Sequence, residues 1–358
     1  MIRPPVSDSR LRAYVQFVLA LVYYFLARLL AHHGAQGIAN DQWMPLVEQA
    51  MLVFLLLFGY AGVGFSLNGQ AHPISAQGLP RRPGWVREAG LGLAIGWGAV
   101  VLCAAVMAVG GGIAIRFSFS RQSWGWFLAD SAFFALLVLG EEIAFRGYPF
   151  QRFARTVGWA GAIIAFAALY AFLQVLQPGA SKAGAVVAAV FSIVLSTAYL
   201  RTRALWVCWG INFGWKAARA LLFGLAVSGV NVHSPVVQGD PMGPFWLTGG
   251  GFGLDGSWLA VFVFLAAIPV VYGLTRDLDF KYNAPEIVPG GIPVDLEAAA
   301  RRQHEAAMGE PAPPLVQIAP AAPASHTANS YPSLFPDPGR SPDASARSTP
   351  PISGNESE

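Results

Sequence analysis

Residues 129–155 read ADSAFFALLVLGEEIAFRGYPFQRFAR, an apolar run with charged side chains inside a length that could cross a membrane. It is one of eight apolar runs bounded by charged residues, proline or glycine. They lie near 12–32, 44–66, 89–110, 129–155, 158–177, 183–200, 204–226 and 257–275. A bilayer core of about 30 Å takes about 20 residues of helix to cross. The spacing therefore predicts an all-α polytopic membrane protein with about eight transmembrane helices.

The composition supports this class and excludes others. Hydrophobic residues make up 54% of the chain and charged residues 12%, a balance that a soluble domain of this size does not need. The net charge is +3 with no dense basic block, so we expect no nucleic-acid partner. Cys103 and Cys208 both fall in apolar runs, where a thiol packs as a small hydrophobe. Because the chain offers no His/Cys ligand set, we expect neither a metal nor another cofactor.

Arginine and lysine are distributed unevenly between the two sides of the predicted bundle. With the amino terminus inside, the inner segments hold Arg3, Arg10, Arg12, Arg81, Arg82, Arg87, Arg152, Arg155, Arg201, Arg203, Arg276 and Lys281. The outer loops hold only Arg116, Arg121 and Lys182, and Arg28 lies near the outer end of the first helix. Positive charge gathers on cytoplasmic loops, so we expect both termini in the cytoplasm and place the protein in a bacterial inner (plasma) membrane. The glycine-rich patches at 90–98 and 109–112 are interpreted as close-packing surfaces or helix ends.

The run 129–155 contains the most informative polar residues. Ionisable side chains at membrane depth are costly, so each is a candidate site. Glu142 and Arg146 are one helical turn apart on the same face and can neutralise each other, which leaves open a purely structural ion pair. Glu141 points about 100° away from Glu142 and has no equally well-placed partner. Glu141 is therefore the hardest of the three to explain as structure alone.

Polar residues in two later runs reach the same depth. Gln174 is about as far from the turn near 157–158 as Glu141 is, so antiparallel helices would place the two level. Asn212, Lys216 and Arg219 share a stripe in the seventh run. We expect Glu141, Gln174, Asn212 and Lys216 to line one intramembrane cavity, although both amides could simply bond neighbouring helices. Lys216 could instead extend to an interface, and Arg219, near the outer end, is expected to do so.

These residues carry a resemblance to a known family. The pattern Glu141-Glu142-x-x-x-Arg146-Gly147, followed by an aromatic helix ending near Pro178-Gly179, resembles the CAAX prenyl protease and bacteriocin-processing family of intramembrane peptidases. The similarity covers about residues 85–275. In that family the first Glu is catalytic, and Phe-x-x-x-His and His-x-x-x-Asn motifs complete the site.

Carried over, the resemblance makes Glu141 the catalytic glutamate and Arg146 the motif arginine. Tyr170-x-x-x-Gln174 and Asn212-x-x-x-Lys216 stand at the two histidine motifs, so both are degenerate here. The predicted site is Glu141, Glu142, Arg146, Gln174, Asn212 and Lys216. Glu141 can take a proton from water, and the amides can hold part of an oxyanion, but they cannot shuttle a proton as imidazole does. A cation that reaches Glu141 would also make it a weaker base.

The resemblance implies endoproteolysis of membrane-associated or prenylated polypeptides by Glu-activated water. The expected partners are such a polypeptide and the lipid bilayer. Two alternatives stay open: a catalytically inactive member that acts as a membrane binding or scaffold protein, and a small-solute transporter, although no internal inverted repeats are visible. We divide the chain into an N-terminal two-helix membrane segment (1–84), a peptidase-like domain (85–275) and a mostly disordered, Pro/Ala/Ser-rich cytoplasmic tail (276–358).

Overall fold

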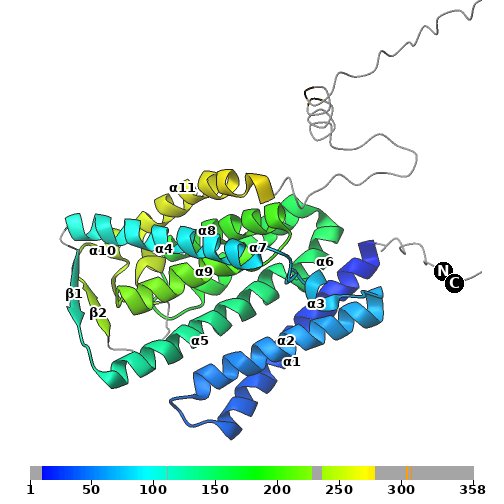
Figure 1. Cartoon of the computed structure of the whole chain (residues 1–358), viewed down its shortest axis with the longest axis horizontal. Helices are drawn as coiled ribbons and strands as arrows, with labels where there is room; N and C mark the ends of the chain where they lie inside the picture. The colour runs from blue at the N-terminus through cyan, green and yellow to red at the C-terminus, as the bar shows by residue number, and fades with distance from the viewer. Residues whose placement is uncertain (1–9, 111, 228–235, 279–303, 305–307, 309–358) are drawn as a thin grey trace, which may run out of the picture. The chain divides into compact units, whose positions relative to one another are not determined.

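The computed structural model describes residues 10–110, 112–227, 236–278, 304 and 308, and each of the eight predicted runs corresponds to helical structure within them (Figure 1). The chain divides into two units, 1–286 and 287–358, and the fold below is that of the first. The predicted tail lies almost entirely outside the described residues. The helices are α1 (Arg10–Ile38), α2 (Met44–Asn68), α3 (Pro73–Ala76), α4 (Trp85–Val109), α5 (Arg121–Arg146), α6 (Tyr148–Val157), α7 (Trp159–Val175), α8 (Lys182–Thr202), α9 (Trp206–Ala217), α10 (Phe245–Thr248) and α11 (Trp258–Leu274).

The helices have the lengths and surfaces of a membrane protein. By length and composition, α1, α2, α4 and α8 can each cross a bilayer, while α7 and α11 are apolar but have only 17 residues. The outer surface of α1 is apolar, with Phe25 66% and Leu29 56% exposed. Such a surface is stable against lipid tails and a liability in water. The prediction of an all-α polytopic membrane protein is confirmed.

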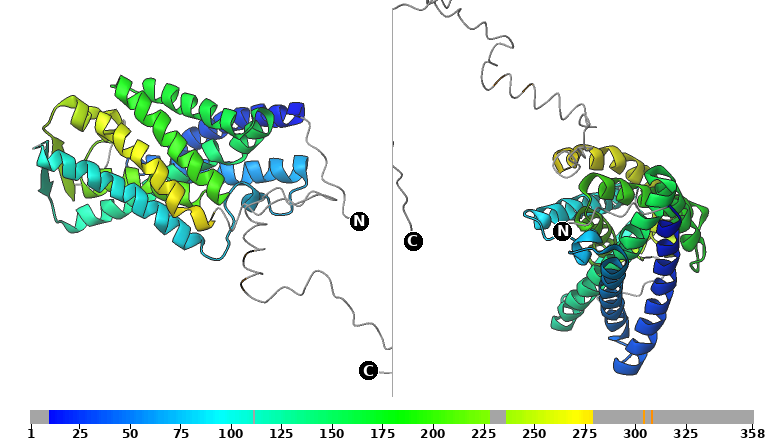
Figure 2. Two further views of the ribbon diagram at one scale, coloured as in Figure 1. Left: turned by 90° about the horizontal axis from the view of Figure 1, so that it is seen from above. Right: turned by 90° about the vertical axis from the view of Figure 1, so that its right-hand side faces the viewer.

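The helices form one bundle with the α1–α2 hairpin along its side. In this bundle α4 packs along α9, and α8 packs against both α7 and α11. The hairpin joins it through α2 on α5 and α1 on α6, as the two views in Figure 2 show. Strands β1 (Ile113–Phe117) and β2 (Val237–Pro241) form an antiparallel ribbon at one end of the bundle, with Ile113 opposite Pro241. The sequence analysis did not predict this ribbon.

The run predicted as one helix over 129–155 is divided at Gly147. A Cβ atom at Gly147 would lie 2.3 Å from the carbonyl oxygen of Ile143, so only glycine fits where α5 ends and α6 begins. Pro149 stands in the first turn of α6, where proline needs no amide partner. At its other end α5 begins earlier than predicted, because the Ser120 side chain accepts a hydrogen bond from the backbone amide of Ser123. The break places Glu142 and Arg146 in the last turns of α5.

A glycine interface between α4 and α9 sets the position of the second site helix. Gly92 and Gly96 on α4 face Gly210 and Gly214 on α9. A Cβ atom would lie 2.1 Å from the carbonyl oxygen of Ile211 at Gly96, and 2.3 Å from that of Ala89 at Gly210. The backbones can approach this closely only because neither helix carries side chains there. The interpretation of residues 90–98 as a packing surface is confirmed.

Candidate active site

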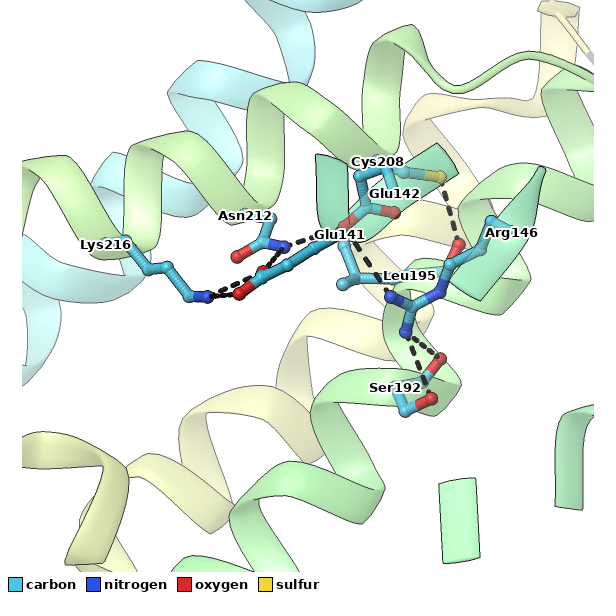
Figure 3. Close-up of polar contacts among 8 residues, drawn as sticks. All are labelled: Glu141, Glu142, Arg146, Ser192, Leu195, Cys208, Asn212 and Lys216. Atoms are coloured by element: carbon cyan, nitrogen blue, oxygen red, sulfur yellow. Dashed lines mark hydrogen bonds and ion pairs between the residues drawn. The ribbon is translucent and has the colours of Figure 1, made fainter. Parts of the chain in front are cut away.

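Two adjacent carboxylates of α5 point into different surroundings. Glu142 and Arg146 are both fully buried, and the Arg146 Nη1 atom lies 3.6 Å from Glu142 Oε1. The side chain of Glu141 is 23% exposed and is turned away from that pair (Figure 3). The two side chains differ in surroundings because adjacent residues of a helix are rotated by about 100° around its axis.

Helix α9 supplies the partners of both carboxylates. The Asn212 Nδ2 atom donates to Glu142 Oε1 at 2.7 Å and to Glu141 Oε2 at 3.0 Å, so one amide bridges the two acids. One turn later the Lys216 ammonium donates to both oxygens of Glu141, at 2.5 and 2.6 Å. The spacing of four residues puts Asn212 and Lys216 on one face of α9, opposite α5. Lys216 therefore pairs with Glu141 and does not extend to an interface.

Arg146 is held from two further helices. Its Nη2 atom donates to the Ser192 hydroxyl on α8 at 3.0 Å and approaches the Ser192 carbonyl oxygen at 3.4 Å. Its guanidinium carbon lies 5.4 Å from the centre of the Tyr170 ring on α7. These contacts connect α5 to α7 and α8 and hold the Arg146 guanidinium away from Glu141. Close by, the Cys208 thiol donates to the Leu195 carbonyl oxygen at 3.1 Å (Figure 3).

A cavity of about 390 Å³ opens beside Glu141. Of the predicted site residues, Glu141, Gln174 and Lys216 line it, whereas Glu142, Arg146 and Asn212 lie behind it with no exposed surface. Its walls come from α1, α2, α5, α7, α8 and α9, and they include aromatic side chains, amides and charges. The arrangement can hold a polypeptide segment against a carboxylate and an ammonium group that touch each other.

The structure adds an ion pair that the sequence analysis missed and corrects one residue. Arg219 was expected to extend to the outer interface, but it is fully buried, and its Nη1 atom lies 2.7 Å from Asp255 Oδ1. The Trp215 indole donates to the same oxygen at 2.9 Å. Arg219 lies in a π-helical turn, Ala218–Leu222, that continues α9. Counting residues from the helix end could not reveal this, because the partner Asp255 is 36 positions away and reaches the cavity wall from the outer segment.

Within the described residues, no group of three or more His, Cys, Asp and Glu side chains lies close enough to hold a metal ion. The acids of this site instead meet nitrogen donors from Asn212, Lys216 and Arg146. The chemistry open to these residues is proton transfer and charge stabilisation.

The fold and the site define an all-α integral membrane protein. Charged side chains from several of its helices line a cavity between those helices. Residues 120–218 match the family model described as Type II CAAX prenyl endopeptidase Rce1-like. The resemblance seen in the glutamate and arginine motif is thereby confirmed over α5 to α9. All six predicted site residues fall inside the matched segment, while α1, α2 and α11 lie outside it. Comparisons with curated proteins and with solved structures returned no match.

Proposed function

We propose that this protein hydrolyses peptide bonds of membrane-associated or prenylated polypeptides, with Glu141 taking a proton from the attacking water. The observation that carries the proposal is the contrast between neighbouring acids: Glu141 lines the cavity with part of its surface exposed, and Glu142 is fully buried. A general base must reach the proton that it removes, and of these two neighbouring acids Glu141 is the one that lines the cavity. Glu142 and Arg146 hold Asn212 and the end of α5 in place.

Lys216 takes the role that an imidazole would play as proton donor. Water loses a proton to Glu141 as its oxygen attacks the carbonyl carbon, and the Lys216 ammonium stabilises the oxyanion that forms. Lys216 then gives a proton to the leaving amine nitrogen as the carbon–nitrogen bond breaks. Glu141 returns its own proton to Lys216 across the 2.5 Å contact, which restores both starting charges. The Gln174 amide on the cavity wall is a further donor toward the oxyanion.

The test is cleavage of prenylated and transmembrane reporter peptides by the purified protein in liposomes. Glu141→Gln keeps the size of the side chain and removes the base, so cleavage should fall at least about a hundredfold, the lower end of the range for a lost general base. Asp41→Asn is the matched control, because it makes the same acid-to-amide change at an exposed residue outside the cavity. Equal cleavage by Glu141→Gln and Asp41→Asn, in folded protein, would overturn the role of Glu141.

A second function is favoured by one observation, the double contact of Lys216 with Glu141. Both oxygens of Glu141 accept from the same ammonium, which leaves the carboxylate less available to a water molecule. On this reading the protein binds a membrane-embedded polypeptide without cutting it. Capture of a reporter peptide would then survive Glu141→Gln but be lost in Leu173→Trp, which fills the cavity from its wall. Cleavage by the unaltered protein decides against this alternative.

We also propose that both termini lie in the cytoplasm, with 1–84 and 85–275 as successive membrane segments. The asymmetry of arginine and lysine between loops supports this orientation. Cys103 and Cys208 are buried, so a single introduced cysteine can report its side by labelling with a membrane-impermeant reagent. Gln36→Cys, at the exposed end of α1, should label from outside, and Arg81→Cys should label only after the membrane is opened. The opposite pattern would reverse the orientation.

A further inference from the structure

Part of the cavity wall comes from outside the segment that matches the family. Tyr24 and Arg28 on α1 and Glu48, Gln49 and Leu52 on α2 line the same cavity as Glu141. The α1–α2 hairpin therefore does more than anchor the bundle, because it contributes polar and charged groups to the surface that a substrate would meet. A family-wide reaction placed on α5 to α9 can obtain its selectivity from this added wall.

Most of the charged side chains that line the cavity contact a side chain that can carry the opposite charge. Lys216 contacts Glu141, and Asp255 contacts the buried Arg219 at 2.7 Å. Glu48 accepts a contact from the Nδ1 atom of His32 at 2.9 Å. Arg28 is the exception among the lining residues, all of which belong to the part of the chain that the structure describes.

Arg28 has a polar contact but no ion pair, although the Glu48 and Glu141 carboxylates act on it from a greater distance. Its Nη1 atom donates to the Tyr24 hydroxyl at 3.3 Å, and no described carboxylate oxygen lies within 4.0 Å of its guanidinium nitrogens. It belongs to a helix apolar enough to cross a membrane, beside the exposed Leu29 and Leu30. A cation in such surroundings is costly unless an anion or water reaches it. A guanidinium binds a carboxylate or a phosphate through two parallel hydrogen bonds, and the carboxylate is the one of these anions that an unmodified polypeptide carries.

We propose that Arg28 binds a carboxylate of the polypeptide substrate and so orients that substrate across the cavity toward Glu141. The inference rests on the proposed function for the identity of the substrate, and it deepens it by naming the group that is recognised. A carboxylate at the chain terminus and one on an aspartate or glutamate side chain share the same chemistry. Arg28 is a specificity-determining residue on this reading and takes no part in proton transfer.

The test measures binding, so it does not depend on cleavage. The background variant combines Glu141→Gln with Lys216→Met. The two changes remove both members of the ion pair, so Lys216 is not left as an unpaired cation that could bind the carboxylate in place of Arg28. Three membrane-anchored peptides serve as probes in phosphatidylcholine liposomes: one with a free terminal carboxylate, one with a terminal carboxamide, and one with a carboxamide and a single internal aspartate. None carries other acidic side chains.

The terminal carboxylate or the internal aspartate should bind about tenfold more tightly than the plain carboxamide, a difference of about 1.4 kcal/mol, because the guanidinium and the carboxylate form a charge-assisted hydrogen bond. Adding Arg28→Gln should abolish that preference, and Arg10→Gln, an exposed arginine of α1 outside the cavity, should keep it. Whichever acidic peptide binds tightly identifies the source of the carboxylate.

Four outcomes would overturn the proposal. They are no preference in the background variant, a preference that survives Arg28→Gln, an equal loss for all peptides in Arg28→Gln, and no binding by any of the peptides. None of these results bears on the cleavage assay with Glu141→Gln, so the failure of one proposal can be told apart from the failure of the other.

Discussion

Glu141 and Glu142 are neighbours in sequence but belong to two different regions of the molecule. The Glu142 side is dry: its carboxylate, Arg146 and Asn212 are all without exposed surface. The Glu141 side faces a cavity, and its partner Lys216 is 14% exposed. Each region contains an acid paired with a base, yet the two pairs exist in different media. One helix thus carries an acid of a fully buried ion pair and, one residue away, an acid of an ion pair that faces a cavity.

The difference shows how a protein separates stability from chemistry. A buried ion pair has lost its water, so each charge depends on the other to remain tolerable. A pair at a cavity keeps some access to water, so either partner can lose or gain a proton without leaving a bare charge in the core. We therefore expect changes on the Glu142 side to act on folding and changes on the Glu141 side to act on function.

The largest effect is expected from Arg146→Met. It leaves the fully buried Glu142 with only the Asn212 amide as a polar partner, so the free energy of unfolding should fall by about 3 to 5 kcal/mol. The measurement is the unfolding midpoint in detergent with a chemical denaturant. Arg121→Met, at the exposed first residue of the same helix, should stay close to the unaltered protein.

Combining Arg146→Met with Glu142→Gln should recover much of that loss, because the second change removes the unpaired charge. A large recovery identifies the pair as structural. If Arg146→Met were as stable as Arg121→Met, the contrast between the two sides of α5 would be wrong.

A smaller effect is expected from the interface that aligns α9 with α5. Gly96→Ala adds a Cβ atom 2.1 Å from the carbonyl oxygen of Ile211, next to Asn212, so α9 must shift. We expect a loss of about 1 to 3 kcal/mol in the free energy of unfolding, together with reduced cleavage as both carboxylates lose their common amide. Gly98→Ala is the matched control, because nothing lies within 4 Å of a Cβ atom there. Equal stability of the two variants would show that close packing at Gly96 does not stabilise the protein.

The sequence was sufficient to predict the parts of the site that depend on position along a single helix. The spacing of four residues specified which side chains share a helix face. In the structure Glu142 contacts Arg146 on the same helix. On α9, Asn212 and Lys216 both contact the carboxylates of α5. Depth counted from the turns also brought Gln174 to the same cavity as Glu141. These inferences worked because a helix has a fixed rise and a fixed rotation per residue.

The missing parts depend on contacts between distant segments. Asp255 pairs with Arg219 from a loop whose path no periodicity predicts, and Arg28 and Glu48 reach the cavity because the α1–α2 hairpin leans on α5. The break at Gly147 was also missed, since an apolar pattern continues through it and only the crowding against Ile143 requires a glycine. Long-range packing, not local propensity, decides each of these features.

The smallest change in stability is expected from Lys216→Met, and it defines the comparison most sharply. Lys216 and Glu141 both keep contact with the cavity, so losing their pair should lower the free energy of unfolding by about 1 kcal/mol or less. Cleavage, however, should fall about a hundredfold, because no other ammonium contacts Glu141 within the described residues to protonate the leaving amine. Lys182→Met, at the exposed start of α8, controls for the loss of a lysine. Faster cleavage by Lys216→Met would mean that the lysine inhibits Glu141 and is not its proton donor. A loss of stability as large as that of Arg146→Met would mean that both ion pairs are structural.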